Sequence, residues 1–167
     1  PVWMKISYLI GKPRTLLIST ILCSLTLATY LFIDTNDALS TLITLTVLYG
    51  IGYGAPFTLT RAMMADIVDA DELRSNKKRP GLFYSILTTF SKVGAAIAVG
   101  LVYTYLEFSG FKPDQIASDR IKEILLFVFA FIPMILYFCA TLFCIGYELT
   151  SEKHKEIQKQ LEFRNGN

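Results

Sequence analysis

The chain has 167 residues, of which 53% are hydrophobic, and it carries a formal net charge of +2. A soluble domain of this length has too little interior for so many apolar residues, and here they occur in long blocks separated by polar stretches. The composition therefore indicates a membrane protein. The small net charge leaves no basic footprint of the kind that nucleic-acid partners require.

The first 14 residues form a short basic lead, and Gly11 and Pro13 are expected to end any helix before the first long apolar run. The second apolar run contains Gly50–Pro56, whose glycines and proline predict close helix packing, a kink or a flexible point. In the fourth run, Pro133 predicts a kink. Each run is long enough to cross a hydrocarbon layer about 30 Å thick. We therefore predict an all-α, polytopic membrane protein with four transmembrane spans, at about 15–33, 38–65, 81–106 and 120–147.

The polar connections predict the orientation of these spans. Lysine and arginine are frequent in the lead, in a charged loop at 66–80 and in the tail at 148–167, whereas 34–37 has none and 107–119 has only Lys112. By the positive-inside rule, both ends of the chain should lie in the cytoplasm, in a protein embedded in the lipid bilayer of the cytoplasmic membrane. In the tail, Leu149, Ile157 and Leu161 share one helical stripe, which predicts a short surface helix.

The remaining unusual residues carry less information. The three cysteines lie inside apolar runs without metal-ligand spacing, so we interpret them as packing residues. His154 is the only histidine and is expected to be a solvated surface residue of the tail. The chain begins at Pro1 rather than Met, and we interpret it as the C-terminal part of a longer protein.

Lys92 is the residue of the third span that most needs an explanation. It lies about 11 residues into the span, roughly 16 Å along a helix and near the middle of a bilayer. A lysine there costs about 2.5–3.5 kcal/mol on insertion scales, so it should face a protein interior or a water-filled cavity. Hydroxyl groups, including Thr88, share its helix face, which suits a polyhydroxyl or anionic ligand. Away from their ends, the predicted spans offer no carboxylate partner, and a structural lysine bonded to backbone carbonyls is the alternative interpretation.

The acidic and basic residues of the loop at 66–80 have two interpretations. Clustered carboxylates can form a metal or acid–base site, but basic residues accompany them here. We therefore favour a salt-bridge cluster that holds helix ends and whose pairs rearrange on conformational change, as a gate does. No catalytic, nucleotide-binding or metal-binding motif occurs, so we expect neither an enzyme nor a cofactor or metal site.

With these residues in view, the chain resembles the glycoside–pentoside–hexuronide:cation symporters, the melibiose-permease-like branch of the major facilitator superfamily. The sequence ADIVDADEL at Ala65–Leu73 is similar to that family's ADIVDYGE-type loop between its tenth and eleventh helices. Weaker similarities extend over nearly the whole chain: Trp3 with Gly11-Lys12, the basic run Lys77–Gly81, Phe90-Ser-Lys92 followed by Gly94-Ala-Ala, Tyr147-Glu-Leu-Thr, and 157–164.

The resemblance implies helices nine to twelve of a twelve-helix fold and cation-coupled symport of a sugar or glycoside by alternating access. It places Lys92, Thr88 and Phe57 in the substrate cavity, although Phe57 stands where melibiose permease has a tryptophan. It places the coupling cation, Na⁺ or H⁺, in an N-terminal half that the chain lacks, so the missing helices would be an essential partner. The residues assigned to the cytoplasmic gate are Asp66, Asp69, Arg74, Lys78 and Arg79.

Two alternatives remain open at this point. A relative that moves lysolipids or other amphiphiles is compatible with Phe57 and with the aromatic residues Phe83, Tyr84 and Phe90 of the third span. A small four-helix membrane protein with a role in interaction or assembly is the alternative from a different class.

Overall fold

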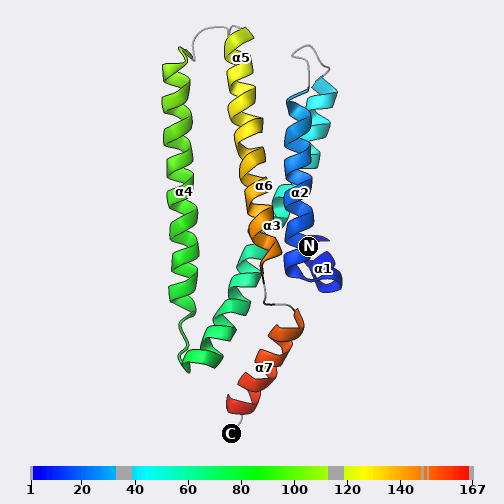
Figure 1. Cartoon of the computed structure of the whole chain (residues 1–167), viewed down its shortest axis with the longest axis vertical. Coiled ribbons are helices and arrows are strands. Elements are labelled where there is room, and N and C mark those ends of the chain that lie inside the picture. The colour runs from blue at the N-terminus through cyan, green and yellow to red at the C-terminus, as the bar shows by residue number, and fades with distance from the viewer. Residues whose placement is uncertain (1, 33–38, 113–118, 148, 150, 166–167) are drawn as a thin grey trace.

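The computed structural model describes residues 2–32, 39–112, 119–147, 149 and 151–165. Described residues form helices α1 (Val2–Ile10), α2 (Lys12–Tyr30), α3 (Leu39–Ser75), α4 (Pro80–Phe108), α5 (Asp119–Leu126), a π-helical turn (Phe127–Phe131), α6 (Ile132–Ile145) and α7 (Ser151–Asn165). The long helices run side by side, and α1, the C-terminal end of α3, and α7 lie toward one end of them (Figure 1). The predicted all-α, polytopic fold class is confirmed.

Among the described residues, three helical segments are long and apolar enough to cross a membrane: α3, α4 and the continuous segment Arg120–Ile145. Four spans were predicted, and the first, represented by α2, does not meet this criterion. The difference comes from the start of the helix: α2 has 19 residues, so every stretch of 18 includes Pro13 and Arg14, which lower its mean hydropathy. Within the helix, the polar residues Thr15, Ser19, Thr20 and Thr26 are all buried. Their hydroxyls donate to backbone carbonyls of the preceding turn, as Thr20 does to Leu16 at 3.0 Å, so little polarity is left unsatisfied.

The lead contains a helix that the sequence analysis did not assign. Helix α1 ends at Ile10, and Gly11 follows with φ of +90°, a backbone conformation that residues other than glycine rarely adopt. Helix α2 then begins at Lys12 with Pro13 in its first turn, where the missing N–H costs nothing. The indole Nε1 of Trp3 donates to the carbonyl of Ile51 at 2.6 Å and ties α1 to α3.

Helix α2 is the central element, packed against both α3 and α6 (Figure 1). One apolar cluster joins Leu16 of α2 to three residues of α3, and a second joins Leu27 and Tyr30 of α2 to Ala130 of the π-helical turn. Helices α2 and α3 approach each other closely at Gly52, where an added Cβ would lie 2.7 Å from the sulfur of Cys23. Of the explanations predicted for Gly50–Pro56, close packing therefore accounts for Gly52. Helix α3 continues as a helix through Pro56.

The charged segment predicted as a loop at 66–80 is mostly helical, because α3 continues to Ser75. No glycine or proline interrupts residues 57–75, and alanine, leucine, glutamate and arginine favour a helix. A helix of 37 residues is about 55 Å long and exceeds a hydrocarbon layer of about 30 Å. Asn76, with φ of +59°, ends it before Pro80 starts α4.

The last two predictions about secondary structure concern Pro133 and the tail. A π-helical turn directly precedes Pro133, where a kink was predicted, and a widened turn relieves the clash of the proline ring with the preceding carbonyls. The predicted surface helix of the tail is present as α7, with Leu161 buried and Ile157 half-buried. Helix α7 packs against α3.

Candidate functional site

A pocket of about 440 Å³ lies between α3 and α4, and we call it the α3–α4 pocket. All three residues expected to contact substrate, Phe57, Thr88 and Lys92, are among those that line it. Its full lining is Tyr53, Phe57, Thr60, Arg61, Tyr84, Leu87, Thr88, Ser91, Lys92 and Ala95.

Helix geometry explains why these side chains meet. Thr88, Ser91, Lys92 and Ala95 are spaced at three and four residues on α4, so they form one face of that helix. On α3, Tyr53, Phe57, Thr60 and Arg61 follow the same spacing, and the two faces border the same pocket. The pocket is therefore a polar and aromatic groove between two otherwise apolar helices.

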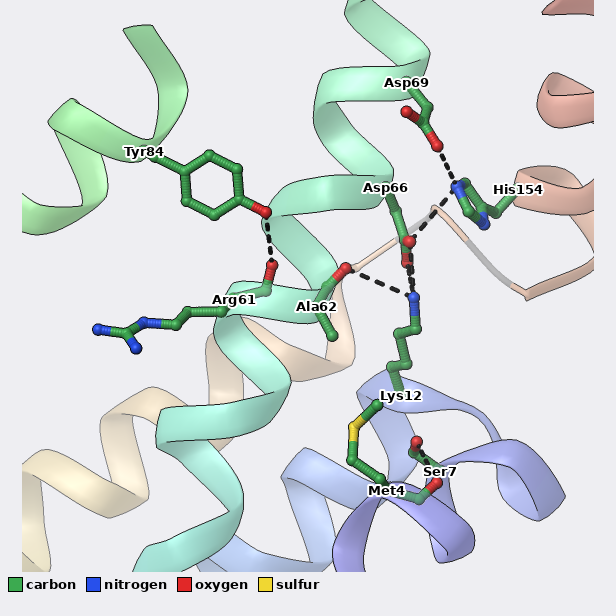
Figure 2. Close-up of polar contacts among 9 residues, drawn as sticks. All are labelled: Met4, Ser7, Lys12, Arg61, Ala62, Asp66, Asp69, Tyr84 and His154. Atoms are coloured by element: carbon green, nitrogen blue, oxygen red, sulfur yellow. Dashed lines mark hydrogen bonds and ion pairs between the residues drawn. The ribbon is translucent and has the colours of Figure 1, made fainter. Parts of the chain in front are cut away.

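Arg61 contributes a second cation, which the sequence analysis did not assign to the site. Its guanidinium carbon lies 4.1 Å from the centre of the Phe57 ring, in a cation–π contact. Figure 2 shows Arg61 directed toward the side of α3 where Tyr84 lies, and the Tyr84 hydroxyl donates to the carbonyl of Arg61 at 3.4 Å. Because Arg61 lies four residues after Phe57, helical spacing is a signal that could have found it.

Helix α4 buries little of its surface within the chain, and the side chain of Lys92 is exposed as a result. Within the most apolar stretch of α4, no residue is buried. Lys92 is exposed, and none of the residues that line the pocket with it is acidic. An apolar helix of this length must be covered by lipid or by other helices, so the exposed surface of α4 is available for such contacts.

The second polar region lies at the opposite side of α3 from Arg61 and joins α2, α3 and α7. Lys12 donates to both carboxylate oxygens of Asp66, at 2.6 and 2.7 Å (Figure 2). The Asp66 side chain is only 6% exposed, so this is a buried ion pair. The glycine turn at Gly11 places Lys12 at the first position of α2, directly beside the final third of α3.

His154 is not the solvated surface residue that was expected. Its Nε2 lies 2.9 Å from a carboxylate oxygen of Asp69 and 3.4 Å from one of Asp66, and its side chain is 14% exposed (Figure 2). The prediction failed because α7 folds back onto α3, which no local pattern in the tail encodes. Further along α7, Arg164 pairs with Glu72 at 3.1 Å. These contacts attach the tail helix to the end of α3.

The five residues assigned to the gate are therefore divided among different partners. Asp66 and Asp69 pair with Lys12 and His154, which lie far away in the sequence. Arg79 makes a bidentate contact with Asp71, and Lys78 lies 3.5 Å from Glu72. Within the described residues, Arg74 forms no ion pair. We call Lys12, Asp66, Asp69, Asp71, Glu72, Lys78, Arg79, His154 and Arg164 the ion-pair cluster.

Comparison with known proteins adds the family. A family model described as MFS/sugar transport protein matches residues 1–151. An uncharacterized symporter of Synechocystis is 33% identical over 132 residues, which cover 75% of this chain and 24% of that protein. The glucuronide carrier protein homolog of Escherichia coli is 26% identical over 155 residues, or 93% of this chain and 34% of the relative. The sodium-dependent lysophosphatidylcholine symporter 1 of Xenopus tropicalis is 26% identical over 117 residues, which cover 68% of this chain and 22% of that protein.

The apolar helices indicate an integral membrane protein, and the family match places it in the transport class. The chain belongs to the MFS/sugar transport protein family. It spans 22% to 34% of the length of these three relatives.

Proposed function

We propose that this chain forms the C-terminal part of a secondary transporter that moves a sugar or glycoside across the cytoplasmic membrane together with Na⁺ or H⁺. The α3–α4 pocket is the observation that carries the proposal, because it gathers Lys92, Thr88 and Phe57 on adjoining helix faces. A lysine deep in a membrane helix is costly unless it serves a cavity, and hydroxyl and aromatic side chains beside it are suited to a polyhydroxylated ligand. Relatives named as a glycoside/cation symporter and a glucuronide carrier homolog agree with this substrate class.

The ion-pair cluster supports a mechanism of alternating access. In such transporters, two halves rock around a central site, and the contacts that close one side must open in each cycle. Here the buried pair of Lys12 and Asp66 joins α2 to α3, and His154 joins α7 to the same end of α3. In our proposal, this end faces the cytoplasm, and the cluster braces the gate. The coupling cation would bind in helices outside this chain.

The test is uptake by the complete transporter in cells or proteoliposomes. Lys92→Ala should abolish uptake without preventing membrane insertion, because the cation that faces the cavity is lost while the apolar helix remains. Lys112→Ala is the matched control, since Lys112 is an exposed lysine beyond the end of α4. Normal uptake by the Lys92 variant would refute the assignment of the pocket.

A second substrate class is favoured by the aromatic lining of the pocket, which includes Tyr53, Phe57 and Tyr84. Three relatives are named as sodium-dependent lysophosphatidylcholine symporters, so an amphiphile with a hydrocarbon tail is the alternative cargo. Competition separates the two classes: a panel of glycosides and a lysolipid are each added in excess during uptake of a labelled substrate. The class that suppresses uptake identifies the cargo.

A further inference from the structure

The α3–α4 pocket has an excess of positive charge that a neutral sugar does not require. Two cationic side chains, Arg61 and Lys92, border it, and its lining contains no aspartate or glutamate. The carboxylates of α3 that lie nearest in sequence, Asp66 and Asp69, are paired with Lys12 and His154 on the other side of the helix. Within the described part of the chain, Arg61 makes no ion pair, and its side chain contacts the Phe57 ring.

The contact with Phe57 leaves the donors of Arg61 available. The guanidinium carbon lies over the aromatic ring, and this cation–π contact uses no conventional hydrogen-bond acceptor, so the N–H groups of Arg61 keep their capacity to donate. A guanidinium presents a fork of donors that matches the two oxygens of a carboxylate or phosphate. The contact with the ring also restricts the side chain, so less rotational freedom is lost when it binds a ligand.

The other polar groups of the pocket supply acceptors. The hydroxyl of Thr60 donates to the carbonyl of Pro56 at 2.6 Å, and that of Ser91 donates to the carbonyl of Leu87 at 2.8 Å. Their hydrogens are used within their own helices, so their free lone pairs can accept hydrogen bonds from the hydroxyls of a ligand. The pocket thus combines strong donors for an oxyanion with acceptors for sugar hydroxyls.

We propose that Arg61 determines substrate specificity by binding an oxyanion, a carboxylate or a phosphate, on the transported sugar, with Lys92 as the second cation. The proposal rests on the transport function above and specifies it: the cargo is a sugar acid rather than a neutral glycoside. Arg61 acts as a binding residue for that one group, so its loss affects the charged substrate and spares the neutral analogue.

The experiment compares three labelled compounds in proteoliposomes that contain the complete transporter: a methyl glucuronide, the matching methyl glucoside, and a hexose phosphate. Wild-type protein should accumulate one or both charged compounds in preference to the glucoside, and the two charged compounds distinguish a carboxylate from a phosphate. Arg61→Gln should raise KM for the preferred charged compound about 10- to 100-fold, the range expected for losing a charge-assisted hydrogen bond. KM for the glucoside should change little. Arg61→Lys, which keeps the charge without the fork, should be intermediate.

Lys77→Gln is the matched control, because it removes an exposed cationic charge outside the pocket. Repeating the assay in vesicles with and without anionic lipid tests whether Arg61 instead binds lipid headgroups. In that case Arg61→Gln would leave the ratio of charged to neutral uptake unchanged, and the inference would be wrong although transport persists. Uptake of a labelled lysolipid but none of the three sugars would also refute it. If the protein moves no compound of either class, the proposed function itself fails.

Discussion

The buried ion pair between Lys12 and Asp66 is the contact whose removal should most weaken the structure outside the pocket. It joins the start of α2 to α3, and the exposed fractions of the two side chains are 21% and 6%. At an effective dielectric constant of about 20, two unit charges about 4 Å apart attract each other by about 4 kcal/mol, and desolvation offsets part of this gain. Removing Lys12 leaves the Asp66 carboxylate buried with only His154 beside it, at 3.4 Å, and a buried charge that loses its partner costs about 3–5 kcal/mol.

The variants that test this are Lys12→Met, Asp66→Asn and the double substitution. Each single change should lower the stability of the complete protein substantially, and the double variant should be less destabilised than the sum of the singles. The coupling energy is expected to be about 1–3 kcal/mol. Arg79 with Asp71 is the matched control pair, because its side chains are 41% and 19% exposed, and its coupling should be about 0.2–1 kcal/mol.

Thermal unfolding of the purified transporter in detergent measures these differences as shifts in Tm, and a chemical denaturant series converts them to free energies. Membrane insertion is checked in parallel for every variant. Additive effects of Lys12→Met and Asp66→Asn would refute the reasoning, as would an Asp66→Asn variant no less stable than Asp71→Asn.

Three further predictions follow from other contacts. Gly52→Ala should lower stability by about 1–3 kcal/mol by crowding the α2–α3 contact, while Gly54→Ala, which meets nothing within 4 Å, should be neutral or stabilising; equal Tm values for the two variants would contradict the packing. His154→Ala should increase hydrogen exchange throughout α7, whereas Gln158→Ala, at an exposed position, should not; unchanged protection would mean that the imidazole does not hold the tail helix. Phe57→Ala should reduce substrate affinity because Arg61 loses its stacking partner, and Phe57→Tyr should retain it; if KM is the same in both variants, the ring has no role in the site.

Much of the local structure could be predicted from the residues alone. The apolar blocks indicated membrane helices, and the spacing of Thr88 and Lys92 placed them on one face of α4, because a helix repeats every 3.6 residues. The clash of a proline ring with preceding carbonyls likewise made a distortion near Pro133 predictable. In contrast, the charged segment after Ala65 was mistaken for a loop, since its polarity outweighed the helix-forming character of its residues.

From the residues alone, this is a membrane protein with a costly lysine in one helix and a charged segment beside it. Which charges meet depends on the tertiary structure. Lys12 reaches Asp66 across 54 residues, and His154 reaches Asp69 across 85. Periodicity relates residues within a helix, but partners on different helices depend on how those helices cross and where their ends stop. The backbone turn at Gly11 between α1 and α2, and the close contact at Gly52 between α2 and α3, help to place these helices relative to one another. The ion pairs depend on that placement.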